Sequence, residues 1–251
     1  MLSEKPWNFE RLVRVIVAVL FFVSFFFLEF AFVQHVAGKQ SLKEGSLGFV
    51  VLNSLGFHGS VLLATAIVLG LDHLSWSDAF GFSKRPIGHA VLLGLSTALV
   101  FLPAAMVLQD VSLRLLEHFH FSTPAEPAVA EFEKATTWAS RAYLVFFAVV
   151  LAPIAEEMFF RGILYTAIKQ FGYPRLALWG SAFIFAFIHL TLAIFVPLVL
   201  LSLVLIWLYE KTDNLLAPIT AHAVFNGINV ILMYYSDSLT ESFRRLFPHL
   251  R

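Results

Sequence analysis

The stretch that decides the fold is Ala155–Gly162, which reads Ala-Glu-Glu-Met-Phe-Phe-Arg-Gly. Its three charged residues, Glu156, Glu157 and Arg161, lie inside an otherwise apolar segment of helix length. Ionisable groups at bilayer depth cost roughly 2.5–3.5 kcal/mol each on insertion scales, so they mark candidate functional sites. Glu157 and Arg161 are four residues apart and share a helix face, which predicts an ion pair. Glu156 is rotated by about 100° from Glu157, and we expect its carboxylate to point into a cavity instead.

The composition predicts an integral membrane protein. Hydrophobic residues make up 59% of the 251 residues and charged residues only 14%, whereas soluble domains have about 25% charged residues. The formal net charge is zero, so nothing points to a nucleic-acid partner. The absence of Cys excludes disulfides, thiol nucleophiles and thiolate metal sites. We expect one multi-pass domain over residues 1–251, with a motif-bearing core at 142–235, in a prokaryotic cell membrane.

Apolar segments of spanning or near-spanning length recur along the chain. They lie at 12–33, 47–71, 87–109, 142–170, 176–190, 193–209 and 215–235. The predicted fold is therefore all-α, a polytopic membrane helical bundle with about seven or eight transmembrane segments. The polar region 110–141 is too charged to span, and short interfacial helices are expected there. Lys and Arg divide eight against eight between the two sides, so the positive-inside rule leaves the orientation open.

Two further polar motifs lie on apolar segments. His189 ends the run Phe-Ala-Phe-Ile-His at 185–189, and His222 and Asn226 are four apart near the start of the last segment. Burying such groups separately costs more than clustering them, so Glu156, His189, His222 and Asn226 are predicted to share one polar cavity. His58, the single histidine of the second segment, is interpreted as a packed, hydrogen-bonded residue.

These motifs carry a resemblance to a known family. The ordered set Glu156-Glu157-x-x-x-Arg161, Phe185-x-x-x-His189 and His222-x-x-x-Asn226 resembles the CAAX protease and bacteriocin-processing family of membrane endopeptidases, also called the Abi or type II CAAX group. The sequences around Arg161-Gly162 and Asn214–His222 are similar as well. The resemblance implies a CAAX-type membrane endopeptidase, a hydrolase, with functional roles at these positions.

The chemistry of the motif residues favours a water nucleophile. The chain has no Cys, and no Ser or Thr occupies a motif position. Glu156 is the candidate general base, and His189 is expected to hold and polarise the water. His222 and Asn226 can donate hydrogen bonds to the oxyanion of a cleaved peptide. The Glu157–Arg161 pair is expected to orient the helix.

Several alternatives stay open at this point. Glu156, His189 and His222 could ligate zinc as in a metalloprotease, although activation of water by Glu156 and His189 without any cofactor explains the same residues. A proton-coupled transporter, or a catalytically idle scaffold or immunity protein, is the competing function. The expected partners are membrane lipid and a peptide or protein substrate, lipidated or not. The oligomeric state and the identity of the substrate are left undetermined.

Overall fold

The computed structural model describes residues 2–36, 43–82, 86–122 and 127–246, and within these ranges it contains helices and turns but no strand. The elements in chain order are α1 (Phe9–Val36), α2 (Leu47–Leu71), α3 (Trp76–Phe80), α4 (Ile87–His118), α5 (Pro127–Lys134), α6 (Trp138–Phe146), η1 (Phe147–Leu151), α7 (Ala152–Glu157), η2 (Met158–Tyr165), α8 (Thr166–Gln170), α9 (Pro174–Phe187), α10 (Leu192–Thr212) and α11 (Leu216–Leu246). The labels η1 and η2 denote π-helical turns, and α6 to α8 with these turns form one continuous helical span, Trp138–Gln170.

The predicted polytopic helical bundle is confirmed. Among the described residues, 6 helices are long and apolar enough to cross a membrane, and the apolar helix α9 is shorter, with 14 residues. A helix of that length rises only about 21 Å, less than the roughly 30 Å of a hydrocarbon core. The protein is an integral multi-pass membrane protein. Of the seven apolar segments predicted, the one at 176–190 forms α9, which is too short to cross the membrane alone.

Large apolar side chains on the outside of the bundle fit this membrane setting. Phe27, Phe32 and Val100 expose 63%, 67% and 80% of their surfaces, which would be unfavourable in water. Lipid tails are as apolar as these side chains, so such a surface is the expected outer face of a membrane bundle.

Two helices extend well beyond the segments predicted from the sequence. Helix α4 does not end near Gln109 but continues to His118, so the interfacial helix expected just after residue 110 is part of α4. The Nε atom of Arg114 donates to Asp110 Oδ2 at 2.7 Å across one turn of this extension, and such pairs support exposed helix. Helix α11 likewise continues beyond residue 235 to Leu246. The second expected interfacial helix is present as α5.

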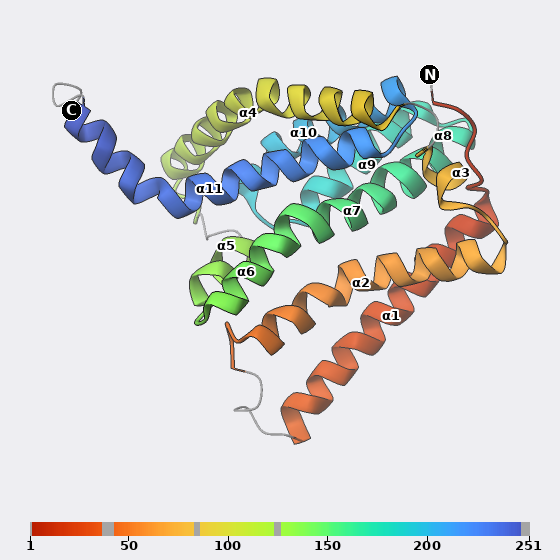
Figure 1. The fold of residues 1–251 in the computed structure, drawn as a ribbon, viewed down its shortest axis with the longest axis horizontal. Coiled ribbons are helices and arrows are strands. Elements are labelled where there is room, and N and C mark those ends of the chain that lie inside the picture. Colours follow the sequence, from red (N-terminus) through yellow and green to blue (C-terminus); the bar gives the residue numbers. More distant parts are fainter. Residues whose placement is uncertain (1, 37–42, 83–85, 123–126, 247–251) are drawn as a thin grey trace.

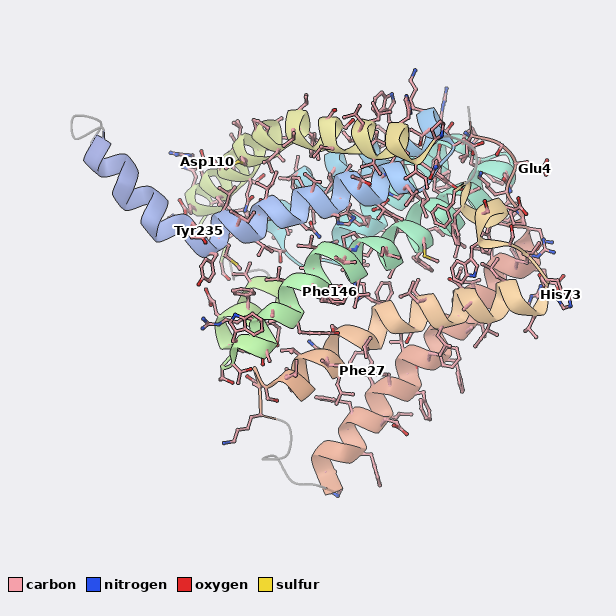
Figure 2. The ribbon with its side chains drawn as sticks, viewed as in Figure 1. Glu4, Phe27, His73, Asp110, Phe146 and Tyr235 are labelled. Atoms are coloured by element: carbon pink, nitrogen blue, oxygen red, sulfur yellow. The ribbon has the colours of Figure 1, made fainter. Side chains whose placement is uncertain are left out.

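The central span lies between two other membrane helices. Figure 1 shows α7 with α11 on one side and α2 on the other, and both helices contact α7. In Figure 2, Phe146 marks the middle of this arrangement, and Tyr235 marks the region where α11 leaves the bundle. Any polar group on α7 can therefore meet partners from α2 and from α11.

A close helix contact fixes the position of α11. A Cβ atom at Gly94 of α4 would lie 2.4 Å from the carbonyl oxygen of Ala217 on α11. Only a residue without a side chain allows the two backbones to approach this closely, as is common between membrane helices. The contact lies about one turn before His222 on α11, so it helps to set the position of that side chain.

The N-terminal segment binds the same end of the bundle, close to the start of α11. The buried indole of Trp7 donates a hydrogen bond to the carbonyl oxygen of Ala79, and Lys5 Nζ lies 2.7 Å from Asp213 Oδ1. Burial, the largest single effect, raises the pKa of Asp213, but the contacts with Lys5 and Ser3 together outweigh burial and leave that pKa below its ordinary value. This segment therefore links α1 to the turn between α10 and α11.

Candidate active site

The central span departs from regular α-helix on both sides of the glutamate pair. The π-turn η1 ends at Leu151, directly before α7 begins, and η2 begins directly after Glu157. Pro153 is the second residue of α7. Because proline has no backbone N–H, it cannot donate the hydrogen bond that a regular α-helix would form at this position. Single π-helical turns inside α-helices occur frequently at functional sites. The backbone geometry thus singles out the same two residues as the charge pattern.

The predicted ion pair between Glu157 and Arg161 is confirmed. Arg161 Nη1 donates to Glu157 Oε1 at 2.8 Å, and the two side chains expose 1% and 0% of their surfaces. The guanidinium carbon of Arg161 lies 4.3 Å from the ring centroid of Phe185, a cation–π contact with α9. The pair is therefore fully withdrawn from solvent and lipid.

A second partner holds Glu157. His222 Nδ1 lies 2.8 Å from the same carboxylate oxygen, Oε1. A carboxylate oxygen accepts, so His222 donates through Nδ1 and directs Nε2 away from Glu157. This Nε2 atom lies 3.8 Å from Glu156 Oε2. One imidazole thereby connects the two neighbouring glutamates.

Glu156 is buried as well, and, as in Glu157, only one of its two oxygens has a hydrogen-bond partner in the described residues. Oε1 lies 2.9 Å from His58 Nε2, whereas Oε2 has no hydrogen-bond partner in the described part of the chain. The side chain of Glu156 is only 10% exposed. A buried carboxylate oxygen without a partner is costly, and it is available to a reacting molecule.

His58 was not predicted to belong to the site. The sequence indicated a hydrogen-bonded membrane histidine, which is confirmed, but it gave no indication that the partner is Glu156. The two residues are 98 positions apart, so no local spacing relates them. The signal that the sequence offered was the ionisable side chain of His58 at membrane depth.

His189 lies at the end of α9, in the turn that leads into α10. Its Nδ1 atom donates to the carbonyl oxygen of Phe185 at 2.8 Å, which leaves Nε2 of the neutral ring as an acceptor. His189 is also an electrostatic neighbour of the Glu156 carboxylate, together with His58 and His222. His58 and His222 are therefore the two histidines that lie within 4 Å of the Glu156 carboxylate, and His189 acts on it from a greater distance.

Asn226 contacts the central span at the π-turn η1, before the glutamate pair. Its Nδ2 atom donates to the carbonyl oxygen of Ala148 at 2.9 Å, in the π-turn η1 that precedes Glu156. An amide nitrogen carries two hydrogens, so this bond leaves the second available. The structure thus places Asn226 on the helix of His222 and against the span of Glu156, and its convergence with the other three side chains stays a prediction.

The charges of the cluster constrain its protonation. Glu156 and Glu157, when ionised, face the single guanidinium of Arg161, which leaves one negative charge in a buried setting. Uncompensated buried charge is strongly unfavourable. One bound proton, on Glu156, His58 or His222, makes the cluster neutral. The arrangement can therefore accept and release a proton close to an unpaired carboxylate oxygen.

The side chains do not fit a ready-made zinc site. Within the described ranges, no three His, Asp or Glu residues are grouped closely enough to hold a metal ion. The Nδ1 atoms of His222 and His189 bind Glu157 and a backbone carbonyl, which leaves both Nε2 atoms free, as in histidines that bind metals. It is the spacing of Glu156, His189 and His222 that does not form a metal site in this geometry.

Fold and site together describe a polytopic membrane protein with a buried glutamate–histidine cluster. Residues 138–228 match the family model described as type II CAAX prenyl endopeptidase Rce1-like. This range contains the Glu-Glu-x-x-x-Arg motif, His189, His222 and Asn226. The resemblance seen in the motifs is thereby confirmed over this segment, and His58 lies outside it.

A curated relative matches the chain over part of its length. The uncharacterized protein YpbD of Bacillus subtilis (strain 168) is 34% identical over 88 residues, which cover 34% of this chain and 42% of YpbD. The match thus spans less than half of that relative. No solved structure matches the chain significantly.

Proposed function

We propose that the protein is an intramembrane endopeptidase of the CAAX-processing type, which hydrolyses a peptide bond with a water molecule activated by Glu156 and His189. The observation that carries the proposal is the buried Glu156 carboxylate, whose Oε2 atom lacks a partner in the described chain and lies 3.8 Å from His222 Nε2. The family match over residues 138–228 supports the same reaction class.

Glu156 and His189 supply the two acceptors that a nucleophilic water needs. A water molecule between them donates one hydrogen to Glu156 Oε2 and the other to Nε2 of His189, whose Nδ1 is already a donor to Phe185. Its oxygen lone pair then faces the substrate carbonyl. As the oxygen attacks the carbonyl carbon, the proton passes to Glu156. When the C–N bond breaks, Glu156 returns that proton to the leaving amine.

His222 and Asn226 are proposed to stabilise the oxyanion that forms during attack. His222 already donates through Nδ1 to Glu157, so it can donate through Nε2 only as an imidazolium. The Glu157 carboxylate stabilises that cation and orients the ring, as the aspartate does in a Ser-His-Asp triad. Asn226 offers its second amide hydrogen to the same oxygen. Each such donor contributes roughly 3–4 kcal/mol to transition-state stabilisation.

The substrate is proposed to be a peptide or protein within or at the membrane. The matched family model names prenyl endopeptidases, which makes a lipidated C-terminus one candidate, whereas an unlipidated membrane peptide fits the same chemistry. Lipid is the surrounding partner, because the outer face of the bundle is apolar.

The decisive experiment compares the peptide termini in membranes that carry the wild-type protein with those that carry Glu156→Ala. Endopeptidase activity predicts at least one new terminus that depends on Glu156 and identifies the substrate. A proton-coupled transporter predicts charge-dependent transport and no such terminus. An idle scaffold or immunity protein predicts that Glu156→Gln retains full biological function. Either of these two results would replace the endopeptidase proposal.

A further inference from the structure

The contact between His58 and Glu156 assigns a role to a residue outside the matched segment. His58 Nε2 lies 2.9 Å from Glu156 Oε1, and His58 Nδ1 lies 3.3 Å from the carbonyl oxygen of Ser54, one turn earlier in α2. A carbonyl oxygen can only accept, so Nδ1 carries a hydrogen. The bond to Glu156 also contains a hydrogen, on one atom or the other. Whichever atom carries it, the bond fixes Oε1.

The imidazole of His58 is itself held on several sides. Its ring centroid lies 4.8 Å from that of Phe147 at an interplanar angle of 90°, and 5.3 Å from that of Phe57 at 88°. Edge-to-face contacts of this kind are favourable for aromatic rings. Phe147 is the first residue of η1. The ring is therefore clamped between α2 and the π-turn that precedes Glu156.

The backbone that supports His58 is tied to the same span. The hydroxyls of Ser54 and Tyr143 lie 2.6 Å apart, which connects α2 to α6. Tyr143 also stacks on Phe147, with an interplanar angle of 18° and a centroid separation of 6.4 Å. Ser54 thus holds the histidine through its carbonyl and holds the central span through its side chain. This arrangement fixes the His58 ring relative to Glu156 more firmly than a single hydrogen bond could.

We propose that His58 is a positioning residue for Glu156. By binding Oε1 it directs Oε2, the oxygen without a partner in the described chain, toward His222 Nε2. A carboxylate that rotates freely about its last bond presents the basic oxygen to the water only part of the time. This inference rests on the proposed function, since it assigns His58 a task in the activation of water by Glu156.

The test uses the purified full-length protein with two substitutions at one position. His58→Phe keeps a ring in the aromatic clamp but removes both nitrogens, whereas His58→Gln restores an amide donor near the place of Nε2. His89→Phe is the matched control, because His89 is an exposed histidine on α4. The cleaved peptide is the one defined by its Glu156-dependent terminus.

The expected result is a selective loss of turnover. His58→Phe should lower kcat by about a hundredfold, the scale expected when a reacting group is misplaced by about 1 Å, with KM within about twofold. His58→Gln should recover at least about a tenth of wild-type kcat. His89→Phe should leave both constants unchanged. A folded His58→Phe protein with wild-type kcat would overturn the proposal.

A spectroscopic measurement separates this proposal from the proposed function. The infrared carboxylate band of Glu156, assigned from its loss in Glu156→Gln, should shift in His58→Phe and not in His89→Phe. A shifted band in a protein that cleaves nothing would sink the endopeptidase proposal while confirming the contact. If His58→Phe fails to fold, His58→Leu takes its place. Failure of both to fold would make His58 a structural residue and overturn its positioning role.

Discussion

His222 links the two neighbouring glutamates of the central span. Its Nδ1 atom lies 2.8 Å from Glu157 Oε1, and its Nε2 atom lies 3.8 Å from Glu156 Oε2. Glu157 Oε1 also accepts from Arg161, so this oxygen has two partners, whereas Glu156 Oε1 has one, His58. In both glutamates the second oxygen, Oε2, has no hydrogen-bond partner in the described chain. The two residues therefore differ in what holds them: Glu157 is tied to a buried cation, and Glu156 is not.

The first prediction separates the two glutamates by stability. Glu157→Gln should lower the free energy of unfolding by about 3–5 kcal/mol, because it leaves the buried Arg161 without its counter-ion. Glu156→Gln should fold normally and lose activity. Thermal unfolding in detergent, together with the cleavage assay, measures both effects.

The control for this comparison is another ion pair of the same spacing. Asp110 and Arg114 are also four residues apart with a 2.7 Å contact, but their side chains are 59% and 75% exposed. Asp110→Asn should leave the unfolding temperature almost unchanged, because solvent screens a pair this exposed. If Glu156→Gln is fully active while Glu157→Gln is folded and inactive, the roles of the two glutamates are reversed.

The second prediction concerns the oxyanion donors. His222→Ala and Asn226→Ala should each lower turnover by about a hundredfold or more, as expected when one donor to an oxyanion is removed. His222→Ala should also lower the unfolding temperature, because Glu157 loses a buried partner. Single-turnover cleavage kinetics separate this chemical defect from slow product release. The control is Asn53→Ala, which changes an exposed asparagine of α2. If Asn226→Ala keeps a turnover within a few fold of wild type, Asn226 has no part in the mechanism.

The third prediction tests the close packing that positions His222. Gly94→Ala should destabilise the protein by about 1–3 kcal/mol, because the new methyl group would overlap the carbonyl of Ala217 and force α4 away from α11. Gly88→Ala on the same helix is the matched control, since a Cβ there has no atom of the described chain within 4 Å. Thermal unfolding measures both variants. Equal stability of the two would mean that the α4–α11 contact is looser than the structure describes.

Local spacing accounts for the part of the site that could be predicted from the sequence. The i,i+4 rule identified the Glu157–Arg161 pair and left Glu156 as the reactive candidate, because both residues of the pair lie on one continuous helix. The segment 47–71 was predicted with its observed boundaries for a similar reason. It is a long apolar run between polar turns, and such runs have few alternative interpretations.

Contacts between distant segments could not be predicted in the same way. The His58–Glu156 bond depends on how α2 packs against α7, and no spacing in the chain encodes that packing. The π-turns η1 and η2 were also missed, because an apolar stretch has the same hydrophobic pattern whether a turn contains four or five residues. The extension of α4 past residue 109 was missed because its polar residues indicated an end to the span, not an end to the helix.

The last prediction addresses metal dependence. If Glu156 and His189 activate water directly, treatment of the purified protein with a chelator should leave cleavage nearly unchanged, and added zinc should not increase it. The reason is geometric: within the described ranges no three His, Asp or Glu residues are grouped closely enough to hold a metal ion. A zinc enzyme with Glu156, His189 and His222 as ligands would instead lose activity on chelation and regain it with zinc. Metal analysis of the chelator-washed, active protein is the direct measurement, with Glu156→Gln as the inactive reference. Stoichiometric zinc that is lost together with activity in His222→Ala would overturn the metal-free mechanism and make His222 a ligand.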